Sequence, residues 1–286
     1  MTPRSWTLDV RGLPLVVWEL SADDADGPPV VCLHGWLDQG LAYATLAQDK
    51  PGRWLALDQR GHGRSGHVGA GGYYHFGDYL GDLDALVRAL GRPVRLVGHS
   101  MGATVASMYA GARPDLVERL VLIDGLGALE ASDPSPLSRM RQHLDGLAHP
   151  PSVGRMANVE AAAERLTRRH VGLPLDHARL LATHGTVPVG GPVGGPDGAG
   201  VRWSFDPLHM TRAPTPFRED FYEEFLRAIT APTLVIWASE SWYPPEVRDR
   251  RGGWIAGATT AVVPGGHMLL YTSAPALAQV IGPFLA

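Results

Sequence analysis

Short runs of apolar residues alternate along this chain with longer stretches of helical periodicity. Continuous apolar runs predict strands that are buried on both faces, as in a parallel sheet. Such runs occur at 30–33 and 54–57, and further strands are expected at 94–97, 117–123, 233–238 and 259–263. An antiparallel hairpin is expected before them, with strands at 6–10 and 15–20 around the turn Arg11-Gly12-Leu13-Pro14.

Helices are predicted between these strands. Leu80, Leu83, Leu86, Val87 and Leu90 form one apolar stripe that ends at Gly91. Further helices are expected at 103–111, at 217–229 and from Ser273, as the N-cap, to about residue 284. Strands and helices in this order predict an α/β fold with a mostly parallel, eight-stranded sheet flanked by helices.

The alternation breaks between residues 125 and 216. Helical patterns occur at 137–147, 159–170 and 176–184, followed by a glycine- and proline-dense stretch at 185–200. A long stretch without periodicity is usually functional or mobile. We therefore expect residues 1–124 and 217–286 to form the core, and residues 125–216 to form a helical cap over the strand ends.

The pentapeptide Gly98-His99-Ser100-Met101-Gly102 lies where a predicted strand meets a predicted helix. A strand-to-helix turn this tight leaves room only for glycine at its flanks, hence Gly98 and Gly102. The serine is then held in a strained conformation with its hydroxyl exposed. The first N–H groups of the helix point at the same place, where negative charge develops during acyl transfer.

Composition narrows the classes of partner. The chain has 286 residues, 45% of them hydrophobic, a formal net charge of −4 and a pI near 6.3. This charge argues against a nucleic-acid or anionic-membrane partner. The N-terminal residues lack the apolar stretch of a signal peptide, and no run approaches the roughly 20 apolar residues that cross a bilayer, so a cytoplasmic protein is expected.

Other chemistries have little support in the sequence. The single cysteine, Cys32, lies in an apolar run, so neither a disulfide framework nor a thiolate metal cluster is expected. No group of histidines and carboxylates has metal-ligand spacing, and no glycine-rich phosphate loop with a lysine occurs. The chemistry is therefore expected to need no cofactor. The sequence does not indicate an oligomeric state.

Taken together, these motifs resemble the α/β-hydrolase family over nearly the whole chain. The resemblance rests on His34-Gly35-Trp36, the loop 58–65, the pentapeptide around Ser100, the cap, and Gly265-Gly266-His267 before the last helix. The cap segment 201–207 is similar to serine-hydrolase-like proteins related to haloalkane dehalogenases. Dehalogenases and epoxide hydrolases use an aspartate nucleophile where this chain has Ser100. Neither dehalogenation nor epoxide hydrolysis is therefore expected at this site.

The resemblance implies a Ser-His-acid triad. A serine hydroxyl needs an adjacent base, and His267 is in the position for that role. The family usually supplies the acid after the penultimate strand, but that position is Ser241 here. Asp124, at the end of the strand that follows the serine helix, is therefore the preferred acid, and Glu240 is the alternative.

By the same resemblance, the backbone N–H groups of Trp36 and Met101 are expected to form the oxyanion hole. Six residues are candidates for the wall of the substrate pocket: Trp36, His99, Met101, Trp203, Trp242 and Met268. The loop 58–65 carries several charged side chains, but it is expected to have a structural role at its strand end.

The function expected from these residues is hydrolysis of carboxylic esters through an acyl-enzyme. The partner is a small ester or a related acyl compound, and activity is expected to fall as the imidazole protonates below about pH 6.5. A carbon–carbon bond hydrolase, a lactonase or another hydrolase would use the same triad, because fold does not fix function. A homologue that only binds a ligand is the alternative from another class.

Overall fold

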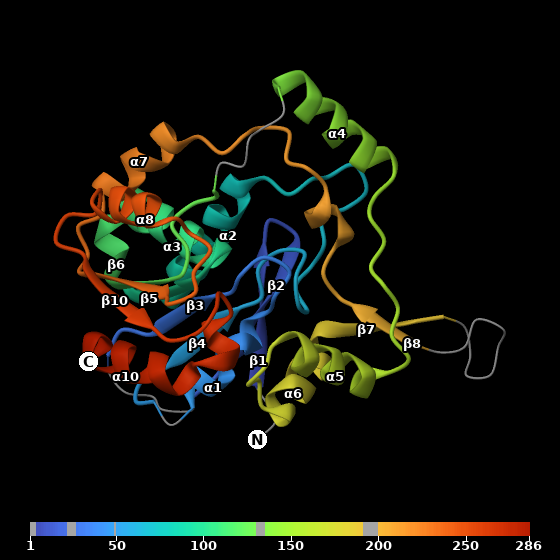
Figure 1. The fold of residues 1–286 in the computed structure, drawn as a ribbon, viewed down its shortest axis with the longest axis horizontal. Helices are drawn as coiled ribbons and strands as arrows, with labels where there is room; N and C mark the ends of the chain where they lie inside the picture. Colours follow the sequence, from blue (N-terminus) through green and yellow to red (C-terminus); the bar gives the residue numbers. More distant parts are fainter. Residues whose placement is uncertain (1–3, 22–26, 49, 130–134, 191–199) are drawn as a thin grey trace.

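A computed structural model describes residues 4–21, 27–48, 50–129, 135–190 and 200–286 of the chain. Its centre is an eight-stranded sheet in the order β1-β2-β4-β3-β5-β6-β9-β10 (Figure 1). The strands are β1 (Arg4–Val10), β2 (Leu13–Glu19), β3 (Val30–Leu33), β4 (Trp54–Leu57), β5 (Val94–His99), β6 (Val117–Ile123), β9 (Thr233–Ala238) and β10 (Thr259–Val263). β2 pairs antiparallel with both β1 and β4, whereas β4, β3, β5, β6, β9 and β10 run parallel to one another, which confirms the predicted fold class.

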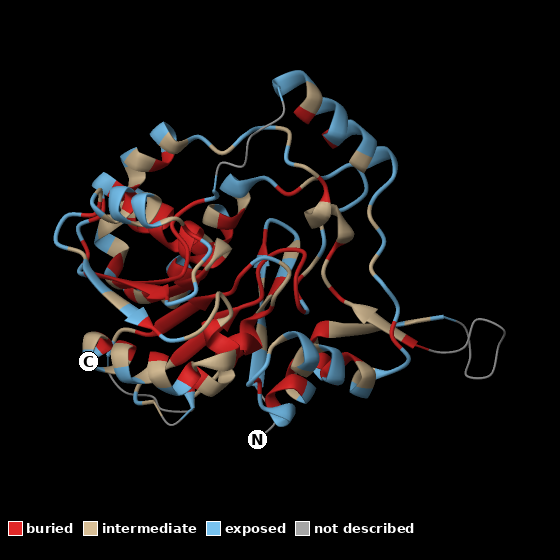
Figure 2. Ribbon diagram, viewed as in Figure 1, coloured by how far each residue is buried: buried red, intermediate tan, exposed pale blue. Residues whose placement is uncertain are grey.

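Helices cover both faces of this sheet, and buried residues concentrate in the strands and on the helix faces turned toward them (Figure 2). Successive side chains of a strand point to opposite faces, so Val31 and Leu33 join one apolar cluster while Val30 and Cys32 join the other. The first cluster includes residues of α2 (Phe76–Leu90), α3 (Met101–Ala112) and α7 (Glu219–Arg227). The second includes residues of α1 (Ala44–Ala47), α9 (Leu269–Thr272) and α10 (Ala274–Leu285).

The segment between β6 and α7 divides into two parts (Figure 1). Helix α4 (Pro136–Ala148) lies apart from the sheet, whereas α5 (Val159–Arg169) and α6 (Leu175–Gly185) pack their apolar faces against the second cluster. Strands β7 (Thr186–Val189) and β8 (Gly200–Trp203) then form an antiparallel pair. The pair is followed by the 3-10 helix η3 (Pro207–Met210).

Several local features differ from the sequence-based expectation. Strand β7 lies inside the stretch 185–200 that was expected to lack regular structure; residues 191–199 of that stretch lie outside the described residues. Helix α8 (Pro245–Gly252) was not predicted, because its polar sequence has no apolar stripe. Ser273 precedes α10 but does not cap it through its side chain, since its hydroxyl donates to the Pro264 carbonyl instead.

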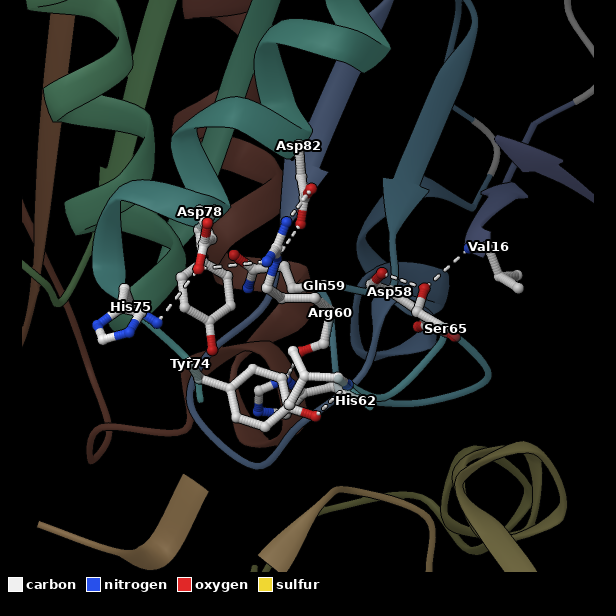
Figure 3. Close-up of polar contacts among 12 residues, drawn as sticks. Val16, Asp58, Gln59, Arg60, His62, Ser65, Tyr74, His75, Asp78 and Asp82 are labelled. Atoms are coloured by element: carbon white, nitrogen blue, oxygen red, sulfur yellow. Dashed lines mark hydrogen bonds and ion pairs between the residues drawn. The ribbon is translucent and has the colours of Figure 1, made fainter. Parts of the chain in front are cut away.

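The loop after β4 is held by buried polar contacts, as Figure 3 shows. Asp58 accepts hydrogen bonds from the Trp18 indole at 2.9 Å and from the Gly40 amide at 2.7 Å. Arg60 forms a two-pronged pair with Asp82, both distances 2.6 Å. These contacts leave no carboxylate of the loop directed at Ser100, so their role is to fix the strand end.

A buried group of histidines joins this loop to η3. The rings of His62 and His209 stack with centroids 4.0 Å apart, and His34 meets His62 edge-on at 5.1 Å. Burial lowers the pKa of His62 to about 4 and lowers that of His34 well below its ordinary value, so both rings are neutral near pH 7. Within the described residues, no helix has both the length and the apolar character to cross a membrane.

Candidate active site

Ser100 occupies a strained turn between β5 and α3. Its φ of 54° and ψ of −116° lie in a region that residues with a side chain rarely adopt. The turn is tight because α3 approaches the strands closely. A Cβ at Gly98 would lie 2.5 Å from the Gly102 carbonyl oxygen, and a Cβ at Gly102 would lie 2.1 Å from the Leu33 carbonyl oxygen. The glycines therefore permit the geometry that exposes the serine hydroxyl.

This geometry predicts that Gly102→Ala destabilises the protein by about 2–4 kcal/mol, because the added methyl group overlaps backbone that cannot move aside. Gly282→Ala is the matched control, since that glycine lies inside α10 with nothing within 4 Å of the added methyl group. It is expected to leave stability unchanged or raise it by up to about 1 kcal/mol. Denaturant unfolding of both variants measures the difference. Equal stabilities would contradict the close packing at Gly102.

His267 lies within hydrogen-bond distance of Ser100. Its Nε2 is 3.0 Å from Ser100 Oγ, and its backbone carbonyl lies 2.8 Å from His99 Nε2. The Trp242 ring packs over the imidazole with centroids 4.0 Å apart. Burial, with a smaller effect of the neighbouring His267, lowers the pKa of His99 to about 4, so His99 stays neutral and acts as a support for the His267 loop.

Asp124 completes a chain of three side chains. Its Oδ2 lies 2.7 Å from His267 Nδ1, and its Oδ1 accepts a hydrogen bond from the Ala238 amide at 3.0 Å. Burial raises the pKa of this carboxyl, but hydrogen bonds from His267, Ala238 and the Ser241 hydroxyl outweigh burial and leave the pKa below its ordinary value. Asp124 is thus ionised at neutral pH. Like Ser100, it has a positive φ, 43°.

Glu240 does not join this chain. Its side chain is exposed, and its backbone amide donates to the Gly265 carbonyl at 3.0 Å. No hydrogen bond between Glu240 and His267 is present among the described residues. The geometry therefore favours Asp124 of the two acids considered. Ser241, at the position where the family commonly has an acid, instead supports Asp124 through its hydroxyl.

The loop of Trp36 runs beside the serine. A Cβ at Gly35 would lie 3.3 Å from Ser100 Cβ, and the Asp38 amide closes a turn onto the Gly35 carbonyl at 3.3 Å. Met101 is the first residue of α3, so its N–H belongs to the helix turn that has no carbonyl partner within the helix. Two elements that could supply oxyanion donors thus meet at Ser100.

A cavity of about 1400 Å³ opens at Ser100. Its wall includes two of the predicted pocket residues, Met101 and Trp242. The other four do not line it. Trp36 is 54% exposed and donates its indole N–H to the His209 carbonyl at 3.2 Å, and His99 is buried beside His267. Trp203 and Met268 pack against the second apolar cluster.

Most of the cavity wall was missed by sequence reasoning. Its apolar and aromatic members include residues of α3, α7 and the segments around them, and residues at or just before the start of α2: Met108, Leu129, Phe217, Phe221, Tyr222, Tyr243, Tyr73, Tyr74 and Phe76. The start of α4 and residues 212–216 also line it. The sequence feature that could have indicated this wall is the amphipathic pattern of α7. In the structure, its aromatic residue Phe221 is 53% exposed and lines the cavity.

Comparison with known proteins identifies the family. Residues 28–274 match the alpha/beta hydrolase fold family. Over 122 residues the chain is 38% identical to a serine hydrolase-like protein of Danio rerio, a match that covers 42% of this chain and 37% of that protein. Over 219 residues it is 29% identical to 2-(acetamidomethylene)succinate hydrolase of Mesorhizobium japonicum, covering 75% of this chain and 71% of that enzyme.

The structural similarity extends further than these sequence matches. The solved thioesterase domain from the curacin biosynthetic pathway superposes with a TM-score of 0.86 at 29% identity, covering 98% of this chain and 99% of that one. The matches to three serine hydrolase-like proteins span 37%, 54% and 50% of those relatives' lengths. The family match covers most of the chain and agrees with the sheet, the serine turn and the position of His267. The chain belongs to the α/β hydrolase fold family.

Proposed function

We propose that this protein is a serine hydrolase that cleaves carboxylic esters through an acyl-enzyme. The observation that carries the proposal is the continuous link from Ser100 Oγ through His267 to Asp124, at a strained turn that faces a cavity of about 1400 Å³. A serine, a base and an ionised acid in this geometry are the parts that acyl transfer requires.

In this mechanism His267 accepts the hydroxyl proton as Ser100 attacks the acyl carbon. Asp124 holds the imidazole with Nδ1–H toward its carboxylate and stabilises the imidazolium that forms. The backbone N–H groups of Trp36 and Met101 stabilise the oxyanion, and such a donor is typically worth about 2.7–4 kcal/mol in the transition state. His267 then protonates the leaving alcohol, and water activated by the same histidine releases the acid and restores Ser100.

The cap is part of this proposal. Helix α4 and residues 212–216 supply its cavity-lining portion, while α5 and α6 attach the segment to the core. Of the predicted cap, 125–216, only this cavity-lining portion is thus assigned to substrate binding. We assign the acyl group, rather than the alcohol, to the cavity, because the aromatic side chains of Trp242 and Tyr243 line it together with Ser100.

Esters with long acyl chains are therefore expected to be better substrates than short ones. Each fully buried methylene contributes about 0.8 kcal/mol, so burial of about two to three of the six additional methylenes should make p-nitrophenyl octanoate exceed p-nitrophenyl acetate in kcat/KM by about 10–100-fold. Met108→Trp fills the cavity wall and should abolish this preference, whereas Met140→Trp, on the exposed part of α4, should preserve it. Hydrolysis of both esters by the three proteins gives the comparison. A preference for acetate in the wild type would place the acyl group elsewhere.

A further inference from the structure

A second, smaller cavity lies between the loop after β4 and the β7–β8 pair. Its volume is about 330 Å³, and it shares no lining residue with the cavity at Ser100. The core loop contributes Arg64 and His67. The other wall contributes His184, at the end of α6, together with Arg202 and Ser204. The proposed ester chemistry uses none of these side chains.

The lining of this cavity is cationic. Among the residues that the structure describes, its lining contains two arginines and two histidines and no aspartate or glutamate. Many other arginines of the chain lie close to a carboxylate, for example Arg60 with Asp82 at 2.6 Å and Arg179 with Glu160 at 2.8 Å. Within the described ranges, neither Arg64 nor Arg202 has such an ion pair. Arg64 is exposed and its guanidinium group lies over the Trp18 ring, 5.6 Å from the centroid, while Arg202 donates to the Trp203 carbonyl at 3.4 Å. Neither of these contacts neutralises the positive charge.

The nearby carboxylates are occupied elsewhere. Arg64 does influence Asp58, but the oxygens of Asp58 already accept hydrogen bonds from Trp18, Gly40 and the Arg64 backbone amide. Asp206 accepts a hydrogen bond from the Tyr74 hydroxyl at 2.7 Å and lies 3.6 Å from His67 Nδ1. Neither carboxylate lines the cavity.

His184, which lines the cavity, also carries an unpaired polar atom. Its Nδ1 is buried and has no hydrogen-bond partner among the residues that the structure describes. Buried polar atoms in folded proteins are normally paired with protein, water or ligand. Burial and the positive charge of Arg64 both disfavour the protonated ring, so an anion in the cavity would relieve both guanidinium groups and the imidazole together.

We propose that this cavity binds the phosphate or sulfate group of a small ligand, held by Arg64 and Arg202 with His184. Guanidinium groups match tetrahedral oxyanions because their N–H groups donate in pairs at a fixed angle. The volume is at the lower end of the range for small-molecule sites. The ligand bridges the core loop and the β7–β8 pair. The chain continues from this pair into η3, whose His209 carbonyl accepts the Trp36 indole N–H.

Isothermal titration with inorganic phosphate, at constant ionic strength in a chloride buffer, tests this site directly. The wild type is expected to bind one phosphate with a Kd in the millimolar range. Arg64→Gln and Arg202→Gln should each weaken binding at least about tenfold, the loss of one charge-assisted contact. Arg165→Gln is the matched control, because Arg165 is exposed on α5 and lies outside the cavity. It should bind as the wild type does.

Several results would overturn the proposal. Binding that survives in both cavity variants, or that weakens equally in Arg165→Gln, would show general attraction to surface charge. Acetate that binds as tightly as phosphate would exclude a site for tetrahedral oxyanions. Thermal melting of each variant checks that folding is intact. A second readout is the His184 ring, whose NMR titration should move to higher pH when phosphate is bound to the wild type. Because binding is measured directly, these results do not depend on ester hydrolysis.

Discussion

Ser100→Ala is expected to lower kcat for p-nitrophenyl octanoate by about 10⁶-fold. The remaining rate is what the oxyanion hole and substrate binding provide without the triad. The alanine keeps the turn and removes the atom that lies 3.0 Å from His267 Nε2. Because the serine, the base and the acid act as a unit, loss of the nucleophile removes the contribution of all three. Steady-state hydrolysis and the release of p-nitrophenol in the first turnover measure the effect.

Ser135→Ala is the matched control for this variant. Ser135 lines the same cavity, but its hydroxyl accepts a hydrogen bond from the Ser138 amide and caps α4. We expect activity close to that of the wild type. Activity that persists in Ser100→Ala would exclude Ser100 as the nucleophile. A wild type that reacts once with a fluorophosphonate at Ser100 but shows no turnover of either ester would favour a ligand-binding homologue or a hydrolase of other bonds.

The fold could be predicted closely because its central strands are buried on both faces. The apolar sequences of β3, β4 and β9 gave their limits, since every residue of these strands is buried. The limits of β6 and β10 also agreed, although the edge strand β10 has three exposed residues. The same reasoning failed for α8, where the helix is largely polar, and for β7, where proline and glycine interrupt the pattern. Periodicity detects elements that bury a face, and these two bury little.

The site was predictable where one segment determines the geometry. The turn at Ser100 is local, so Gly98 and Gly102 specify it from sequence. The cavity wall is different, because residues such as Met108 and Tyr243 are distant in sequence and come to line one cavity only in the folded chain. Trp203 looked equally suitable from its aromatic side chain, yet it packs against the second apolar cluster.

Sequence alone could not choose between Asp124 and Glu240, because the choice depends on which carboxylate lies near His267 Nδ1. Substitution of the chosen acid gives the second large effect that we expect. Asp124→Asn is expected to lower kcat by about 10⁴-fold with little change in stability. The asparagine oxygen can still accept the Ala238 amide, which leaves the NH₂ group facing His267 Nδ1. That Nδ1 must then act as the acceptor, so the proton moves to Nε2 and the ring can no longer receive the Ser100 proton.

Glu240→Gln is the matched control, because it also removes one negative charge, from the loop after β9. It is expected to retain kcat within about twofold. Thermal melting shows whether either variant is unfolded, and kcat for p-nitrophenyl octanoate gives the comparison. A loss in Glu240→Gln with near-normal turnover in Asp124→Asn would mean that the loop after β9 rearranges to bring Glu240 to His267 when substrate binds. A loss in Asp124→Asn with near-normal turnover in Glu240→Gln would identify Asp124 as the acid of the triad. In that arrangement the Ser241 hydroxyl, at the position where the family commonly has the acid, stabilises the ionised Asp124.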